Sequence, residues 1–195
     1  MSLKIGIAGP VGSGKTSLIE AATNILKEKY KIGIVTNDIY TTEDANYLKQ
    51  SLDLPPEQII GVETGGCPHT AIRDDISMNQ KAVVELEEKF NPDIIFVESG
   101  GDNLSATFSY ELIDYYMYII DTAQGADIPR KKGAGLLFSD LLVVNKTDLA
   151  PYVGVNLDSM QEDVKANRKN KPYVFISNKD KKSLEQVLEW IEALI

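Results

Sequence analysis

The chain has 195 residues, 43% of them hydrophobic and 25% charged, which suits one compact domain, residues 1–195, with a buried core. Its formal net charge of −9 and the shortness of its basic stretches argue against nucleic acid and membranes as partners. A lone cysteine cannot form an internal disulfide, and the N-terminal MSLKIGIAGP has no long apolar run, so we expect a reduced, cytoplasmic protein.

Short apolar stretches alternate with helix-like stretches along the whole chain. Several of the apolar stretches are continuous, which favours strands covered on both faces and therefore a parallel sheet. The alternation predicts an α/β fold with a doubly wound, mostly parallel sheet flanked by helices. We expect strands at residues 3–8, 31–36, 58–62, 93–98, 115–122, 140–145 and 173–177, and helices at residues 15–29, 71–90, 157–167 and 183–194.

The stretch GPVGSGKT, residues 9–16, fits the phosphate-loop pattern G-x-x-x-x-G-K-[ST] and lies between the first predicted strand and the first predicted helix. Its glycines let backbone amides approach phosphate oxygens, Lys15 supplies a positive charge, and the Thr16 hydroxyl is suited to Mg²⁺. An ordinary glycine-rich turn is the alternative, but the strand-and-helix context favours a P-loop NTPase. We expect the nucleotide to contact Gly9, Gly12, Ser13, Gly14, Lys15, Thr16 and Ser17.

A second nucleotide motif, N-K-x-D, follows a later predicted strand as Asn145, Lys146 and Asp148. An Asp carboxylate can accept hydrogen bonds from both the N1–H and the 2-amino group of guanine, whereas adenine has no such group. Alone, the tetrapeptide also fits a solvated turn. After a P-loop in a parallel sheet it predicts a site for GTP.

Acidic residues follow three of the predicted strands. Asp38, Glu63 and Glu98 stand where loops beyond the carboxyl ends of parallel strands would face the phosphates. We therefore assign these three acids, together with Lys15, to the catalytic site. Glu43 and Asp44 lie in TTEDA, which is typical of a helix start, so we interpret them as capping or solvated charges.

The only cysteine and the only histidine, Cys67 and His69, are separated by one proline. In an extended segment residues i and i+2 point to the same side, so both side chains can face one metal ion. A buried thiol beside a structural histidine is the plainer interpretation. Two ligands do not complete a site, but a two-fold symmetric dimer would supply two thiolates and two imidazoles. Such a ligand set fits zinc, nickel or copper, with zinc favoured on general grounds.

Taken together, these segments resemble the UreG-type urease accessory proteins, which are GTPases of the nickel-chaperone class. The resemblance covers nearly the whole chain and includes GPVGSGKTSLIEA, TNDIYTTEDA, IIGVETGGCPHTAIRDDISMN, ESGGDNLSATF, DIPRKKGAG and SDLLVVNKTDLAPYVG. It implies a cytoplasmic protein that binds GTP and Mg²⁺, hydrolyses GTP slowly, forms a homodimer when loaded, holds Ni²⁺, and delivers it to apo-urease with other urease accessory proteins.

By the same resemblance, Thr16, Asp38 and Glu63 would hold Mg²⁺, while Cys67 and His69 would bind nickel. The chain departs from some related dimeric NTPases at Val11, where no second lysine is present to reach across a dimer. It also has no histidine-rich N-terminal extension, so metal storage is not expected.

Three other functions fit parts of the sequence. A GTPase that matures another metalloenzyme, such as a hydrogenase, is disfavoured by the full string ETGGCPHTAIRDD. A small-molecule kinase would share the P-loop but would not need N-K-x-D, and its lid would have only Arg130, Lys131 and Lys132. A nucleotide-gated scaffold that does not hydrolyse GTP is the third.

Overall fold

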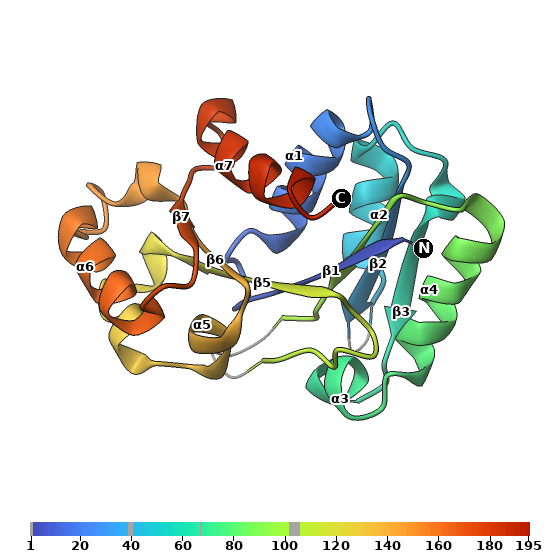
Figure 1. Cartoon of the computed structure of the whole chain (residues 1–195), viewed down its shortest axis with the longest axis horizontal. Helices are drawn as coiled ribbons and strands as arrows, with labels where there is room; N and C mark the ends of the chain where they lie inside the picture. The colour runs from blue at the N-terminus through green and yellow to red at the C-terminus, as the bar shows by residue number, and fades with distance from the viewer. Residues whose placement is uncertain (1, 39–40, 67, 102–105) are drawn as a thin grey trace.

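The structure is a computed structural model that describes residues 2–38, 41–66, 68–101 and 106–195. Its centre is a seven-stranded sheet in the order β3-β2-β4-β1-β5-β6-β7, and every strand pair in the described part of the chain is parallel (Figure 1). The parallel α/β sheet predicted from the sequence is confirmed. The strands are β1 Leu3–Ala8, β2 Ile32–Asp38, β3 Ile59–Glu63, β4 Ile94–Glu98, β5 Tyr115–Asp121, β6 Leu141–Asn145 and β7 Tyr173–Phe175.

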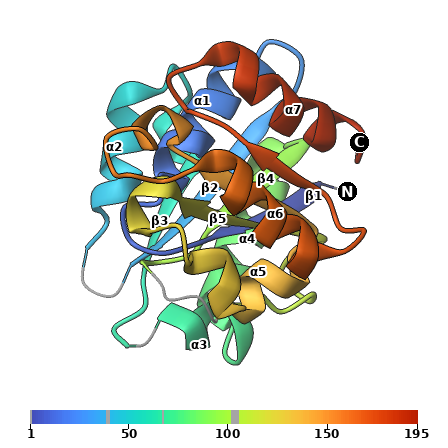
Figure 2. The ribbon, with the colours of Figure 1, turned by 90° about the vertical axis from the view of Figure 1, so that its left-hand side faces the viewer.

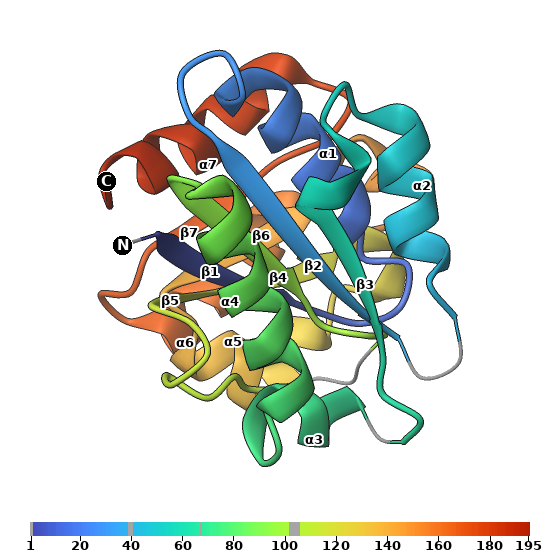
Figure 3. The same ribbon diagram turned by 90° about the vertical axis from the view of Figure 1, so that its right-hand side faces the viewer.

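Helices cover both faces of this sheet. Figures 1, 2 and 3 show α1, α2 and α7 on one face and α3, α4, α5 and α6 on the other. None of the helices in the described residues is long and apolar enough to cross a lipid bilayer. Their bounds are α1 Lys15–Leu26, α2 Glu43–Ser51, α3 Pro68–Arg73, α4 Ser77–Phe90, α5 Ala134–Phe138, α6 Leu157–Arg168 and α7 Lys181–Glu192.

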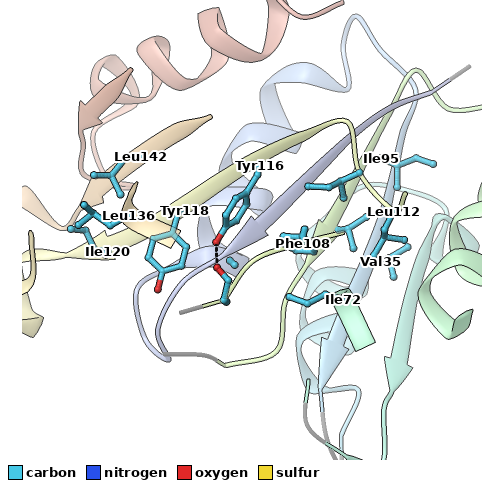
Figure 4. Packing of buried hydrophobic residues seen from close by; sticks show 14 of the residues in the cluster. Val35, Ile72, Ile95, Phe108, Leu112, Tyr116, Tyr118, Ile120, Leu136 and Leu142 are labelled. Carbon is cyan, nitrogen blue, oxygen red and sulfur yellow. Dashed lines mark hydrogen bonds between the residues drawn. The ribbon is translucent and has the colours of Figure 1, made fainter. Parts of the chain in front are cut away.

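The strands contribute alternate residues to two hydrophobic cores, one on each face of the sheet. On β5, Met117 and Ile119 pack under α1 and α7, whereas Tyr116 and Tyr118 belong to the core under α3–α6 (Figure 4). The Tyr116 hydroxyl is buried in this second core and donates a hydrogen bond of 2.5 Å to the carbonyl of Ala106. Because helices cover both faces of the sheet, the strands are mostly apolar, as the sequence indicated.

The single helix expected at residues 71–90 is wrong, because two helices, α3 and α4, occupy this stretch. The amide of Asp75 donates to the carbonyl of Thr70 (2.8 Å), which closes α3, and the Asp75 carboxylate accepts from the amide of Ser77 (3.3 Å), where α4 begins. The buried Asn79 side chain then donates to the carbonyl of Ala71 (2.9 Å) and fastens the two helices together. The short helix α5 was not predicted.

Candidate functional site

The carboxyl ends of the parallel strands meet at one edge of the sheet, and nearly all the predicted site residues lie there. Strand register sets Glu98 of β4 opposite Ile7 of β1 and Thr36 of β2. It also pairs Asp121 of β5 with Asn145 of β6. Ligands of open α/β sheets bind outside this edge, so the register itself brings the phosphate loop, the acids and N-K-x-D together.

The loop between β1 and α1 has no room for a side chain at two of its glycines. A Cβ at Gly9 would collide with the carbonyl of Ile119 on β5, and a Cβ at Gly14 would collide with the Asn145 side chain. Gly14 also has a left-handed φ of 96°. The loop is therefore packed tightly against β5 and β6.

The carbonyls of Gly12, Ser13 and Gly14 all face the segment after β6 and β7. They accept hydrogen bonds from the Lys146 ammonium, the side-chain Nδ2 of Asn145 (2.9 Å) and the side-chain Nδ2 of Asn178 (3.2 Å), respectively. A trans peptide directs its N–H opposite to its carbonyl. The amide of Ser13 donates to the carbonyl of Pro10 (3.1 Å) within the loop. The amides of Gly14 and Lys15 point away from the N-K-x-D segment, on the side where an anion would bind.

One cavity, of about 520 Å³, lies beside the N-K-x-D segment. The Asp148 carboxylate lines it and accepts a hydrogen bond from the Ser177 hydroxyl (2.8 Å), which fixes its orientation. The side-chain oxygen Oδ1 of Asn145 accepts from the backbone amides of Lys146 (2.7 Å) and Asn178 (3.3 Å). The remaining lining residues are Gly14, Ser17, Glu20, Ala21, Asn24, Leu149 and Lys179.

A second cavity, of about 580 Å³, opens on the other side of the loop and shares Gly14, Ser17 and Lys146 with the first. Lys15 is 7% exposed and donates to the carbonyls of Gly9 (3.0 Å) and Pro10 (3.4 Å). The two cavities adjoin at the phosphate loop, and together they make room for a base at one end and a polyphosphate at the other.

Glu98 is the most perturbed acid of the site. Its side chain is 1% exposed, and the Thr16 hydroxyl donates a 2.6 Å hydrogen bond to its Oε1. Burial raises the pKa of Glu98 from its ordinary 4.5 to about 7, although Lys15 and the Thr16 hydroxyl oppose this rise. Its other oxygen, Oε2, has no hydrogen-bond partner among the described residues. A buried oxygen beside a threonine hydroxyl is suited to a hard cation such as Mg²⁺.

Of the other acids, Asp38 and Asp44 line the second cavity. Asp38 accepts a hydrogen bond from the Thr41 hydroxyl, and Asp44 lies close enough to Glu98 to raise its pKa. Glu63 pairs with Asp38 across β3 and β2 but is exposed, and it lies outside the cavity lining formed by described residues. Its assignment to catalysis and to Mg²⁺ stays a prediction, and Asp44 is better placed than the sequence indicated.

Comparisons with known proteins agree with this geometry. The family described as CobW/HypB/UreG, nucleotide-binding domain, matches residues 3–175. Proteins named urease accessory protein UreG are similar over nearly the whole chain: that of Aliarcobacter butzleri is 84% identical over all of both chains, and that of Lysinibacillus sphaericus is 58% identical over 97% of this chain and 91% of its own. The chain belongs to the CobW/HypB/UreG family.

Solved structures of this family share the fold. The hydrogenase maturation factor HypB from Archaeoglobus fulgidus has a TM-score of 0.78 at 23% identity, with 99% of this chain and 90% of that chain covered. HypB from Helicobacter pylori, in complex with nickel, has a TM-score of 0.81 at 22% identity, with 98% and 86% covered. At these identities the likeness establishes the fold alone, which is the P-loop NTPase fold expected from the sequence.

The predicted metal motif of this family member lies at the edge of what the structure describes. Cys67 falls outside the described residues, and of His69 only the backbone is described, as part of α3. Among the described residues, no group of three or more His, Cys, Asp or Glu side chains is arranged to hold a metal ion. The nickel assignment of Cys67 and His69 therefore stays a prediction.

Among the residues of the nucleotide site that sequence reasoning missed, four lie at or after the ends of β5 and β7. Ser177, Asn178 and Lys179 follow β7 and line the first cavity, and Asp121 at the end of β5 forms an ion pair with Lys146 (3.4 Å). The general rule that loops after parallel strands line the ligand crevice would have pointed to both segments. No recognised motif marks them. Ser177 donates to Asp148, Asn178 donates to the carbonyl of Gly14, and Asp121 pairs with Lys146, and these contacts form only in the folded chain.

Proposed function

We propose that this chain is a GTP-binding and GTP-hydrolysing metallochaperone. It dimerises with GTP and Mg²⁺, holds nickel at a Cys-Pro-His site shared by two chains, and delivers the metal to apo-urease. Other urease accessory proteins are its partners, and the cytoplasm is its compartment. Zn²⁺ is an alternative metal for the same ligands.

One observation supports the nucleotide part of the proposal above all others. The two adjoining cavities share the phosphate loop, and the cavity next to β6 has Asp148 in its wall with Ser177 orienting its carboxylate. A carboxylate in that place suits the two N–H donors of guanine and leaves an adenine poorly paired. GTP is therefore the nucleotide that this site fits best.

The residues of the second cavity suit the phosphates and their cation. The Lys15 ammonium would pair with the β- and γ-phosphates, and the Thr16 hydroxyl, Asp38 and Glu98 are oxygen ligands of the kind that Mg²⁺ takes. When bound, Mg²⁺ would neutralise charge on these phosphates. Glu98, whose pKa burial raises to about 7, would hold such a cation in its ionised form, since a carboxylate ligand is deprotonated.

The nickel part of the proposal rests on composition and kinship. The chain has one cysteine and one histidine, so four soft ligands require two chains. Its relatives are named urease accessory proteins, and nickel is bound in the H. pylori HypB structure. Thr64 connects the nucleotide site to the metal motif, because it lies three residues before Cys67. Its amide (2.9 Å) and its hydroxyl (3.2 Å) both donate to the carbonyl of Asp38.

Size-exclusion chromatography with light scattering tests the proposal. The purified chain is run alone, with Ni²⁺, with Mg²⁺ and a non-hydrolysable GTP analogue, and with all of them together. We expect a monomer without ligands and a dimer when nucleotide and Ni²⁺ are both present. The matching non-hydrolysable ATP analogue, used in place of the GTP analogue, is the control and should not support the dimer. A dimer formed equally well with the ATP analogue would favour the kinase alternative, and a monomer under all conditions would contradict the shared metal site.

A further inference from the structure

Lys146 connects the two cavities of the nucleotide site. It lines both of them, and its ammonium donates to the carbonyl of Gly12 in the phosphate loop. Its backbone has a left-handed φ of 58°, which non-glycine residues seldom adopt and which neighbouring groups must therefore hold in place. What fixes Lys146 thus determines how the base segment is placed relative to the phosphate loop.

The end of β5 holds Lys146 at two points. Oδ2 of Asp121 lies 3.4 Å from the Lys146 ammonium, and the Thr122 hydroxyl donates a 2.6 Å hydrogen bond to the Lys146 carbonyl. Asp121 is 1% exposed and Thr122 is fully buried, so both groups that hold Lys146 are shielded from water, whereas the Lys146 side chain itself is 32% exposed. One contact orients the side chain, and the other supports the strained backbone.

Asp121 is itself held rigidly. Its Oδ1 accepts from the amide of Ala123 (2.8 Å), and its own amide donates to the side chain of Gln124 (3.3 Å), which together form a capping box on the turn Thr122–Gln124. One carboxylate oxygen is therefore occupied by the turn while the other faces Lys146. A carboxylate fixed in this way can place an ammonium group without rearranging when nucleotide binds.

We propose that Asp121 and Thr122 are positioning residues of the nucleotide site. They act through Lys146, holding it across the phosphate loop so that the base pocket and the phosphate pocket bind one nucleotide as a unit. The inference rests on the proposed function only for the identity of that nucleotide. Neither residue belongs to the P-loop or to N-K-x-D, and neither lines either cavity.

A double-mutant cycle on the full chain tests this role. The variants are Asp121→Asn, Lys146→Met and the two combined, and affinity is measured with fluorescent GDP by direct titration. Asp121→Asn should weaken binding about ten- to a hundredfold, as expected for loss of a charged partner. If Asp121 acts through Lys146, the Asp121→Asn substitution made in the Lys146→Met variant should weaken binding further by less than about twofold. Asp127→Asn, which removes an exposed ion pair with Lys131, is the control and should bind as the wild type does.

The Thr122 pair supplies a second, independent arm. Thr122→Val keeps the shape but removes the hydroxyl and should weaken binding about fivefold or more, whereas Thr122→Ser keeps the hydroxyl and should restore it. Should Asp121→Asn fail to fold by circular dichroism, this arm carries the test. The proposal would be overturned if Asp121→Asn lowered GDP affinity equally in the wild-type and Lys146→Met backgrounds. It would also be overturned if Thr122→Val bound GDP as tightly as the wild type. Wild-type selectivity for GDP over ADP is measured separately, and its absence would refute the guanine assignment without altering the cycle.

Discussion

The buried carboxyl of Glu98 lowers the stability of the folded chain when it is ionised, although it is placed to bind a ligand. Its carboxyl is buried against Lys15 and Thr16, and its second oxygen has no partner among the described residues. With a pKa raised by burial to about 7, roughly half of the Glu98 carboxyls in the nucleotide-free chain are protonated at neutral pH. Such a residue is typical of a site whose ligand supplies the missing charge.

This environment predicts a pH dependence of folding stability. The folded pKa of Glu98, about 7, exceeds its ordinary 4.5, so the folded chain holds the proton more tightly and this contribution to stability is lost as pH rises from about 5 to 8. The pKa difference corresponds to about 3 kcal/mol. Glu98→Gln should therefore gain stability over the wild type as pH rises, measured by urea unfolding of the nucleotide-free chain. The exposed variant Glu88→Gln is the control, and a Glu98→Gln difference that stays constant from pH 5 to 8 would refute the assignment.

Asp148 should determine the choice of base. Asp148→Asn should lower affinity for GTP and raise tolerance for xanthosine triphosphate, because an amide can donate to the 2-oxo group of xanthine. Loss of a hydrogen bond to a charged group predicts about a tenfold or greater fall in GTP affinity by calorimetry. Asp158→Asn, on the exposed start of α6, should leave affinity unchanged. Unaltered GTP and xanthosine affinities in Asp148→Asn would remove Asp148 from the base pocket.

At the scale of elements, Arg168 joins segments that the sequence gives no reason to connect. The side chain is 2% exposed at the end of α6, and its guanidinium donates to the carbonyls of Leu136, Ser139, Asp140 and Pro172 at 2.7–3.3 Å. Burial lowers its pKa to about 10 against the opposing effect of Asp140. One side chain thus ties α6 to α5 and to the starts of β6 and β7.

Arg168→Lys should therefore destabilise the fold although it keeps the charge. A single ammonium cannot reach all these carbonyls, and buried carbonyls left unpaired predict a loss of about 2–4 kcal/mol in unfolding free energy. Urea denaturation measures the loss, with the exposed Lys165→Ala on the same helix as the control. Wild-type stability in Arg168→Lys would mean that charge alone matters. Neither variant should change nucleotide affinity of the folded chain, since neither residue lines a cavity.

At the scale of the whole molecule, the sequence predicted what periodicity and motifs determine. All seven strands were expected where they occur, because buried parallel strands are continuously apolar. The break between α3 and α4 was missed, because the apolar pattern shows neither the contact of Asp75 with Ser77, where α4 begins, nor that of Asn79 with Ala71, which joins the two helices. Asp44 was taken for a solvated charge because its helix start was visible but the cavity beneath it was not. Asp121 was not predicted, because the pairing of β5 with β6 is what places it beside the N-K-x-D segment.

The central claim is that nucleotide brings two chains together around one metal ion. Equilibrium dialysis against Ni²⁺, with Mg²⁺ and the non-hydrolysable GTP analogue present, tests it most directly. We expect one tightly bound Ni²⁺ per two chains. This binding should be lost without nucleotide, and it should also be lost in Cys67→Ala and in His69→Ala, both of which should still bind GTP. One tightly bound metal ion per chain, unaffected by Cys67→Ala, would contradict the account.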